Sequence, residues 1–155
     1  MGRILKEFPD ADRVSALICL VKKGAAAHLL DWQHSTKVER FEHLVVFLHR
    51  AKVDTTEDIR TALKSAVFCT DLQSLEGVGP KTIDYMACLV GIESIAVDRH
   101  IRNFAVRAGV NNRDYDFLKN AFCFAADLLS ISRREFDAWV WSREARQQPQ
   151  LTFTF

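Results

Sequence analysis

A glycine-rich turn followed by a proline and a lysine is the feature of this chain that points most directly to chemistry. In the stretch LEGVGPKTIDYM, residues 75–86, Gly77 and Gly79 suit a turn that needs positive φ angles or a close approach to another surface. Pro80 suits a first helical position, so a helix is predicted to begin there with Lys81 in its first turn. The free N–H groups of that turn and helix start would form a local positive end that can bind phosphate.

Apolar residues spaced three and four positions apart predict amphipathic helices along nearly the whole chain. No long alternating pattern indicates a sheet, so the predicted fold class is all-α. Leu72 and Leu75 before the glycine turn, with Ile83 after it, would pack two helices around a hairpin. The other predicted helical stripes cover residues 14–21, 38–48, 59–66, 118–129 and 136–140.

Residues that can cap helix N-termini support these predicted helices. Thr55 or Asp54 can cap the helix that carries Ile59, and Ser132 with Glu135 three residues later fits a capping box. No repeat or linker divides the chain, so we expect one compact helical domain over residues 1–146 and a tail at residues 147–155.

Composition limits the partners, the cellular location and the cysteine chemistry that can be expected of this protein. The 155 residues carry a formal net charge of +1 at pH 7, so the total charge alone does not require a nucleic acid partner. Basic residues are in excess between Lys81 and Arg113, which fits either a phosphate-facing strip or a solvated helix face.

No apolar run approaches the ~20 residues that cross a bilayer, and the N-terminus lacks a secretory signal pattern, which predicts a cytoplasmic protein. The four cysteines are widely separated, which indicates buried free thiols and neither a zinc nor an iron–sulfur site: Cys19, Cys69, Cys88 and Cys123.

Residues 75–105, LEGVGPKTIDYMACLVGIESIAVDRHIRNFA, resemble the signature of the helix-hairpin-helix DNA glycosylase superfamily, which contains endonuclease III and the 8-oxoguanine DNA glycosylases. In that superfamily a hairpin of the form L-x-G-V-G-x-K is followed, after a helix and a loop, by a V-D-x-H segment. Matched by position, the resemblance implies a catalytic lysine at Lys81 and a catalytic carboxylate at Asp98. It further implies a DNA-repair enzyme of base excision, acting on damaged or abasic double-stranded DNA.

The chemistry of glycosidic bond cleavage explains such a pair. A carboxylate stabilises the positive charge that builds on the sugar, and a neutral amine can attack the sugar carbon and remain attached as a Schiff base. A free lysine, with a pKa near ~10.4, is almost wholly protonated at neutral pH, so Lys81 would need a helix N-terminus, desolvation or nearby arginine charge to lower its pKa. The alternatives remain open: Lys81 as an exposed charge, and Asp98 as an N-cap, a role that is compatible with catalysis.

The resemblance also implies contacts with DNA. Backbone N–H groups of Gly77, Val78 and Gly79 would contact a phosphate, together with the side chains of Lys81, Arg99 and Arg102. The backbone carbonyls of Gln73, Leu75 and Val78 correspond to positions where superfamily hairpins hold a monovalent cation, Na⁺ or K⁺; no other cofactor is expected.

Other candidates have plainer interpretations beside the functional one. Gln33 corresponds to a glutamine that, in related glycosylases, fills the gap left by an extruded base. The favoured interpretation is that Gln33 is an ordinary polar residue on the surface. His100 follows Asp98 as in the superfamily pattern and is expected to make a structural hydrogen bond. Tryptophans could stack on an extruded base, but at helical spacing they are more often core residues: Trp32, Trp139 and Trp141.

Three departures from the superfamily pattern affect the base pocket. The chain is shorter than most members, Glu76 replaces a common proline beside the expected phosphate site, and the C-terminal cysteine cluster of endonuclease III is absent. We therefore expect a minimal DNA glycosylase with associated abasic-site lyase activity, in a cytoplasmic, DNA-associated protein. The alternatives are a non-catalytic helix-hairpin-helix DNA-binding module and a protein-interaction domain.

Overall fold

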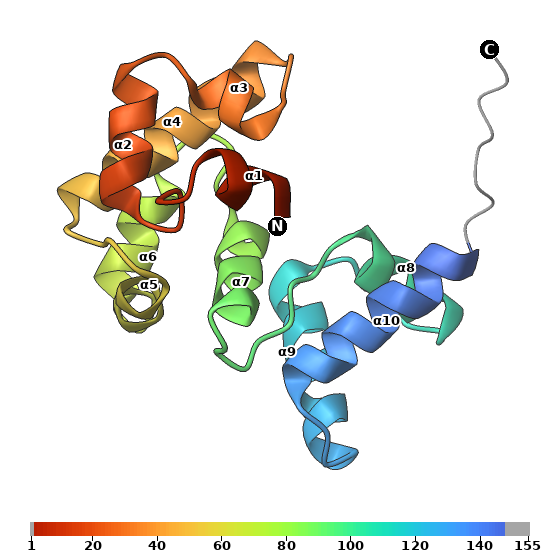
Figure 1. Ribbon diagram of the computed structural model, residues 1–155. Helices are drawn as coiled ribbons and strands as arrows, with labels where there is room; N and C mark the ends of the chain where they lie inside the picture. The colour runs from red at the N-terminus through yellow and green to blue at the C-terminus, as the bar shows by residue number, and fades with distance from the viewer. Residues whose placement is uncertain (1, 148–155) are drawn as a thin grey trace, which may run out of the picture. The chain divides into compact units, whose positions relative to one another are not determined.

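Every regular element in the described part of the chain, residues 2–147 of a computed structural model, is an α-helix, which confirms the all-α prediction (Figure 1). None of these helices is both long and apolar enough to cross a membrane. In chain order they are α1 (Gly2–Glu7), α2 (Val14–Lys22), α3 (Ala26–Leu30), α4 (Ser35–Arg50), α5 (Thr56–Ala62), α6 (Ala66–Gln73), α7 (Pro80–Leu89), α8 (Arg99–Arg107), α9 (Tyr115–Leu128) and α10 (Arg133–Gln147).

Backbone contacts divide the chain into two compact units, residues 1–79 and residues 80–155. The division falls between Gly79 and Pro80, directly before α7. The single domain over residues 1–146 stays a prediction. Of the predicted tail, residues 148–155 lie outside the described residues, and Gln147 is the last residue of α10.

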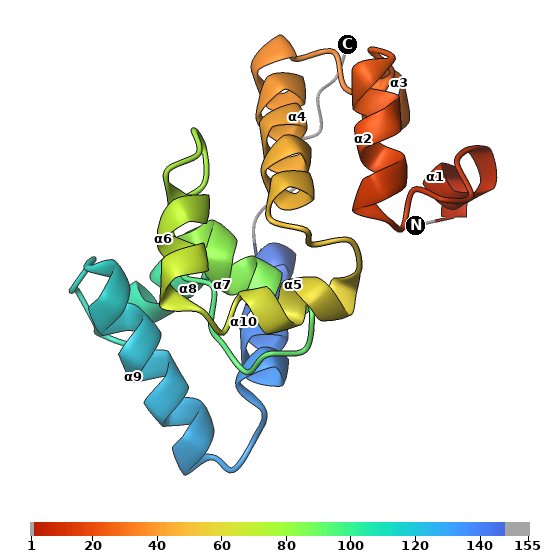
Figure 2. The same ribbon diagram turned by 90° about the vertical axis from the view of Figure 1, so that its left-hand side faces the viewer.

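The first unit has its core between α2 and α4, which lie side by side (Figure 2). The apolar stripes predicted for both helices supply that core, because one face of each helix is apolar. Val53 closes the core from the segment that follows α4. Its buried members are Val14, Ile18, Val45, Leu48 and Val53.

The prediction of one helix over residues 59–66 is wrong. Helix α5 ends at Ala62 and α6 begins at Ala66, so the apolar stripe continues across a break. Ser65 accounts for the break, because its hydroxyl accepts a hydrogen bond from the N–H of Phe68 and caps a new helix. The predicted cap at Thr55 is confirmed, and it forms a capping box with Asp58.

The second unit is built on α10, which packs against α8 and α9. Its core joins these helices to the segment between α7 and α8, and its buried members are Ile95, Val97, Ile101, Ala105, Leu118, Phe122, Ala126, Phe136 and Val140. The buried Glu144 of α10 forms an ion pair with Arg107 of α8, which ties the two helices together at that end.

The capping box predicted from Ser132 and Glu135 is present in part. The Ser132 hydroxyl accepts from the N–H of Glu135 at 3.4 Å. A carboxylate from elsewhere in the chain, that of Glu93, accepts from the Ser132 hydroxyl and from the N–H of Arg133. Glu93 therefore fixes the start of α10 to the loop that follows α7.

The four cysteines are free, as predicted, but the prediction that they are buried is wrong for Cys19, which is exposed on α2. Cys69, Cys88 and Cys123 are half-buried. Burial raises the pKa of the Cys88 thiol to about 11, and the nearby carboxylates of Asp137 and Asp84 add to that rise. This thiol is therefore protonated at neutral pH and is a poor nucleophile.

The two glycines of the turn between α6 and α7 differ in conformation. Gly77 has a φ of +83°, which L residues rarely adopt, and a Cβ placed there would lie 2.7 Å from Cδ of Arg40. Arg40 donates to Glu76 at 2.7 Å and holds the pKa of that carboxyl below its usual value. Gly79 has neither a positive φ nor a described neighbour within 4 Å of such a Cβ. The fold thus requires glycine at Gly77 and leaves Gly79 open to a close approach from outside.

The two glycines should respond differently to alanine. Gly77→Ala should destabilise the protein by about 1 kcal/mol, because a positive φ is unfavourable for an L residue and the new methyl group would displace Arg40. Gly79→Ala is the matched control and should change stability by less than about 0.5 kcal/mol. Urea unfolding followed by circular dichroism measures both. If both variants lose the same stability, the positive φ of Gly77 and its contact with Arg40 are not what makes glycine favourable at that position.

Candidate active site

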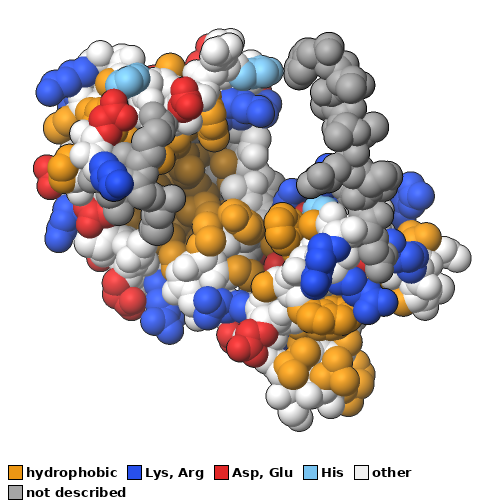
Figure 3. Space-filling view, turned by 45° about the vertical axis from the view of Figure 1, so that its right-hand side comes forward, with side chains coloured by type: hydrophobic (Ala, Val, Ile, Leu, Met, Phe, Trp, Pro, Cys, Tyr) orange, Lys and Arg blue, Asp and Glu red, His pale blue; other side chains and the backbone are white. Residues whose placement is uncertain are grey.

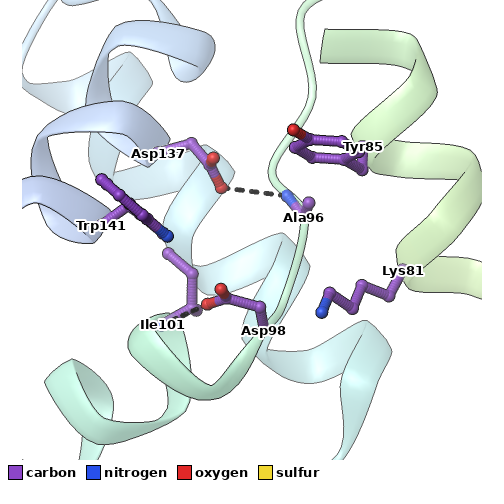
Figure 4. Close-up of a pocket in the computed structure, with 7 residues that line it drawn as sticks. All are labelled: Lys81, Tyr85, Ala96, Asp98, Ile101, Asp137 and Trp141. Carbon is purple, nitrogen blue, oxygen red and sulfur yellow. Dashed lines mark hydrogen bonds between the residues drawn. The ribbon is translucent and has the colours of Figure 1, made fainter. Parts of the chain in front are cut away.

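A pocket of about 170 Å³ in the second unit brings Lys81 and Asp98 together (Figure 4). Lys81 comes from the first turn of α7, and Asp98 immediately precedes α8. The volume is below the ~300–1,000 Å³ of sites for drug-sized ligands, so it suits a group of the size of a sugar or a single base. The pocket is lined by Lys81, Tyr85, Ala96, Asp98, Ile101, Asp137 and Trp141.

Lys81 is exposed, and its side chain extends from α7 toward Asp98 (Figure 4). Its amine lies more than 4.0 Å from every carboxylate oxygen of the described residues, so it forms no ion pair there. The other lysine of this unit, Lys119, is bonded to Asp84 at 2.6 Å. Lys81 is therefore the lysine of the second unit whose amine is available to a ligand.

Asp98 is both the N-cap of α8 and part of the pocket wall. Its Oδ1 accepts from the N–H of His100 at 2.7 Å and from the N–H of Ile101 at 3.1 Å. Both bonds use the same oxygen, so Oδ2 has no hydrogen-bond partner among the described residues. The capping role considered for this residue is confirmed, and it leaves one carboxylate oxygen available to the pocket.

Asp137, on α10, is a second carboxyl in the pocket wall. Its Oδ1 accepts from the backbone N–H of Ala96 at 3.1 Å (Figure 4). Burial raises the pKa of Asp137 to about 6, and the negative charges of Asp98 and Asp84 add to the rise, whereas the bond from Ala96 lowers it. This carboxyl can therefore gain or lose a proton within the range of pH in which enzymes work.

Two aromatic side chains stand at the pocket with much of their surface in solvent. Tyr85 is 54 % exposed and Trp141 is 55 % exposed. Exposed aromatic rings at a polar pocket are suited to stacking on a planar group such as a nucleobase. Trp141 is held in place by a T-shaped contact with the ring of His100, at 5.7 Å between centroids.

His100 is buried beside the pocket and does not line it. Its Nε2 accepts a hydrogen bond from Nε of Arg99 at 3.3 Å, the structural kind of contact expected for this residue. Through its contact with Trp141, His100 positions an aromatic wall of the pocket.

A buried carboxylate fixes α7, and with it Lys81, to the rest of the unit. Asp84 accepts from the Ser94 hydroxyl at 2.7 Å, from Lys119 at 2.6 Å and from the Tyr115 hydroxyl at 2.7 Å. Burial of Tyr115 and its bond to this carboxylate raise the pKa of the phenol. Because Asp84 lies one helical turn beyond Lys81, the network sets where the pocket face of α7 lies.

The remaining predicted DNA-binding residues lie outside this pocket. The N–H of Val78 donates to the carbonyl of Leu75 at 3.1 Å, so it is engaged within the turn. The N–H groups of Gly77 and Gly79 donate to no described residue. Arg99 and Arg102 lie on α8 and line a separate cavity.

The predicted cation site and Gln33 belong to the first unit. Of the carbonyls of Gln73, Leu75 and Val78, that of Leu75 accepts the bond described above, so a bound cation would share it. Gln33 is exposed in the segment between α3 and α4. The roles implied for these residues stay predictions.

A larger cavity, about 380 Å³, lies in the first unit around α2 and the segment that follows α1. Its wall combines apolar groups with the carboxylates of Glu7 and Asp10 and the thiol of Cys19, and none of its described lining residues is cationic. The smaller pocket of the second unit instead combines an amine with two carboxyl groups and two exposed aromatic rings. We therefore take the smaller pocket as the candidate active site.

Comparisons with protein-family models, with curated proteins and with solved structures found no match to this chain. The chemistry of the site must therefore be argued from its own residues.

Two lining residues with polar side chains, Tyr85 and Asp137, had no role in the sequence interpretation. A sequence signal for both exists, since Tyr85 lies four residues after Lys81 and Asp137 lies four residues before Trp141. Side chains four apart share one face of a helix. The sequence does not reveal that these two faces meet, because α7 and α10 are brought together only by folding.

The raised pKa of Asp137 predicts how stability depends on pH. A carboxyl with a folded-state pKa of about 6, against 3.8 for the free group, binds its proton more tightly in the folded protein. Its contribution is therefore favourable at low pH and is lost as the pH rises from about 4 to about 6. Asp137→Asn keeps the acceptor for the Ala96 N–H and removes that loss, so its melting temperature should gain on the wild type as pH rises across this window.

Melting curves at a series of pH values measure this gain. Glu39→Gln, which alters an exposed carboxyl on α4, is the control and should follow the wild type. A difference between Asp137→Asn and the wild type that stays constant from pH 4 to pH 7 would contradict the burial of the Asp137 carboxyl.

Proposed function

We propose that this protein is a DNA glycosylase with associated abasic-site lyase activity, in which Lys81 is the nucleophile and Asp98 the assisting carboxylate. The observation that supports the proposal is that one pocket is lined both by Lys81, which has no ion pair among the described residues, and by Asp98, whose Oδ2 accepts no hydrogen bond from them. The resemblance of residues 75–105 to helix-hairpin-helix glycosylases supports the same assignment.

The pocket contains a group for each requirement of this chemistry. The carboxylate of Asp98 would stabilise the cation that forms on the sugar, because a negative charge fixed beside the developing positive charge lowers the energy of the transition state. The neutral amine of Lys81 would form a bond to the sugar carbon as the bond from that carbon to the base breaks and the base leaves. With an abasic aldehyde the same amine would form an imine, and one molecule of water is lost in that step. Tyr85 and Trp141 offer ring surfaces to a base that has left the stack.

DNA binding by the turn would rely on its backbone. The N–H groups of Gly77 and Gly79 are available to a phosphate, and Gly79 permits a close approach because nothing described surrounds it. The ion pair of Glu76 with Arg40 reduces the repulsion that a free carboxylate would exert on that phosphate. On the face drawn in Figure 3, Lys and Arg side chains lie in separate groups with acidic side chains among them, so local sites would hold DNA.

Trapping the imine tests the nucleophile directly. The wild-type protein, mixed with an abasic duplex and borohydride, should give a stable protein–DNA adduct, because hydride reduces the imine to a secondary amine. Lys81→Gln should give none. The control Lys64→Gln alters an exposed lysine of the first unit and should give the normal yield. Peptide mapping must place the adduct at Lys81.

An adduct that persists in Lys81→Gln, or no adduct from the folded wild type, would exclude the lyase and favour the non-catalytic DNA-binding module.

Asp98→Asn tests the carboxylate apart from its capping role. Asparagine is also a good N-cap, so the fold should be retained while the negative charge is lost. Imine formation at an abasic site, measured in single turnover, should fall by about a hundredfold, because the carboxylate would stabilise the positive charge that develops as the carbinolamine loses water; this is the scale of losing one electrostatic stabiliser. The matched control is Asp114→Asn, which makes the same change at the N-cap of α9 and should leave the rate unchanged. Equal rates in the two variants would assign Asp98 to capping alone.

A further inference from the structure

A second cavity of the same unit is lined by arginine and asparagine side chains. It measures about 210 Å³ and lies between one face of α8 and the segment that follows it. No carboxylate is among its described lining residues, which are Arg99, Arg102, Asn103, Val106, Asn112 and Arg113.

The arginines of this cavity differ from most others in the described chain by lacking a carboxylate partner. Arg99 donates to the His100 ring, Arg102 donates to the backbone carbonyl of Arg113, and none of the three forms an ion pair with a described residue. Three like charges around one cavity repel each other, and a bound anion would relieve that repulsion. Elsewhere the ion pairs are Arg13 with Asp54, Arg40 with Glu76, Arg60 with Glu57, Arg107 with Glu144 and Arg133 with Asp127.

Three polar side chains of the cavity, those of Arg99, Arg102 and Asn112, are held by hydrogen bonds. The bond from Arg102 to the carbonyl of Arg113 ties α8 to the following segment and fixes that guanidinium. The Oδ1 of Asn112 accepts from the N–H of Asp114 at 2.8 Å, which leaves its NH₂ group as a donor. Guanidinium groups match the oxygens of a phosphate in geometry and in charge.

We propose that this cavity is a phosphate-binding site. This inference rests on the function proposed above. The ligand is a backbone phosphodiester of the DNA strand whose nucleotide occupies the pocket of Lys81. Asp98 lines that pocket and the adjacent Arg99 lines this cavity, so the start of α8 connects the two sites. A phosphate held here would fix the register of the strand while the sugar meets Lys81.

Arg113→Gln is the test variant, because it removes a guanidinium and keeps the backbone carbonyl that holds Arg102. A fluorescent duplex with a non-reactive abasic analogue is titrated at several salt concentrations. Arg113→Gln should bind about tenfold more weakly, and the slope of log K against log salt should fall by about one, as for the loss of one phosphate contact. Arg113→Lys should retain the slope.

The control is Arg146→Gln, which removes the same charge from an exposed side chain whose hydrogen bonds to described residues all go to Ser142 of its own helix. It should leave the slope unchanged. If Arg113→Gln and Arg146→Gln behave alike, the cavity is not a phosphate site. Should the wild type still form the borohydride adduct in that case, the proposed function stands and only this inference fails.

A second titration, with inorganic phosphate followed by NMR of the arginine Nε–H groups, identifies the source of the phosphate. Shifts at Arg99 and Arg102 that disappear in Arg113→Gln, with no duplex binding and no adduct, would support a site for a free phosphate compound and overturn the DNA function. No such shifts, together with a duplex affinity that does not depend on Arg113, would overturn the phosphate site itself.

Discussion

The buried carboxylate of Asp84 is the constraint on which the geometry of the second unit depends. A buried charge is tolerated only when it is paired and hydrogen-bonded, and Asp84 has Ser94, Tyr115 and Lys119 as partners. These partners come from the loop after α7 and from α9, so the network cannot form unless α7 lies against both. Lys81 and Tyr85 are on the same helix, and their positions follow from that of Asp84. The hydrogen bonds of Asp84 thus set the positions of two pocket residues, although Asp84 itself does not line the pocket.

Three aspartates of this unit show how environment separates the roles of one residue type. Asp84 is enclosed by three donors and serves the fold. Asp98 shares one oxygen between two backbone N–H groups, which leaves its other oxygen to the pocket. Asp137 has one backbone donor and a pKa raised by burial to about 6. Within one unit, the same side chain can therefore anchor a helix, line a pocket and hold a proton near neutral pH.

Charge in this protein is organised locally, which the net value of +1 conceals. Several arginines are neutralised by carboxylates, among them Arg107 by the buried Glu144 and Arg40 by Glu76. Arg99 and Arg102 have no such partners, and Lys81 is likewise unpaired within the second unit. A polyanion would therefore be attracted by a few positions and not by a uniformly basic face. Contacts of this kind are sensitive to salt, because each one releases counterions from the nucleic acid.

The sequence by itself determined the helical class and most helix positions, since apolar period and capping chemistry are local properties. It singled out Lys81 and Asp98 only through the resemblance of residues 75–105 to a known superfamily, and the structure places both at one pocket. It also showed the turn at Gly77, although the positive φ belongs to Gly77 alone and Gly79 adopts an ordinary backbone conformation. Local pattern failed over residues 59–66, where Ser65 starts a new helix beneath a continuous apolar stripe. Only the tertiary structure placed Asp137 and Trp141 opposite Lys81, surrounded Asp84 with donors and gathered Arg99, Arg102 and Arg113 around one cavity. Each of these arrangements joins residues from different elements, and the energy that selects them comes from burial and charge pairing across the folded unit, which no local stretch of chain contains.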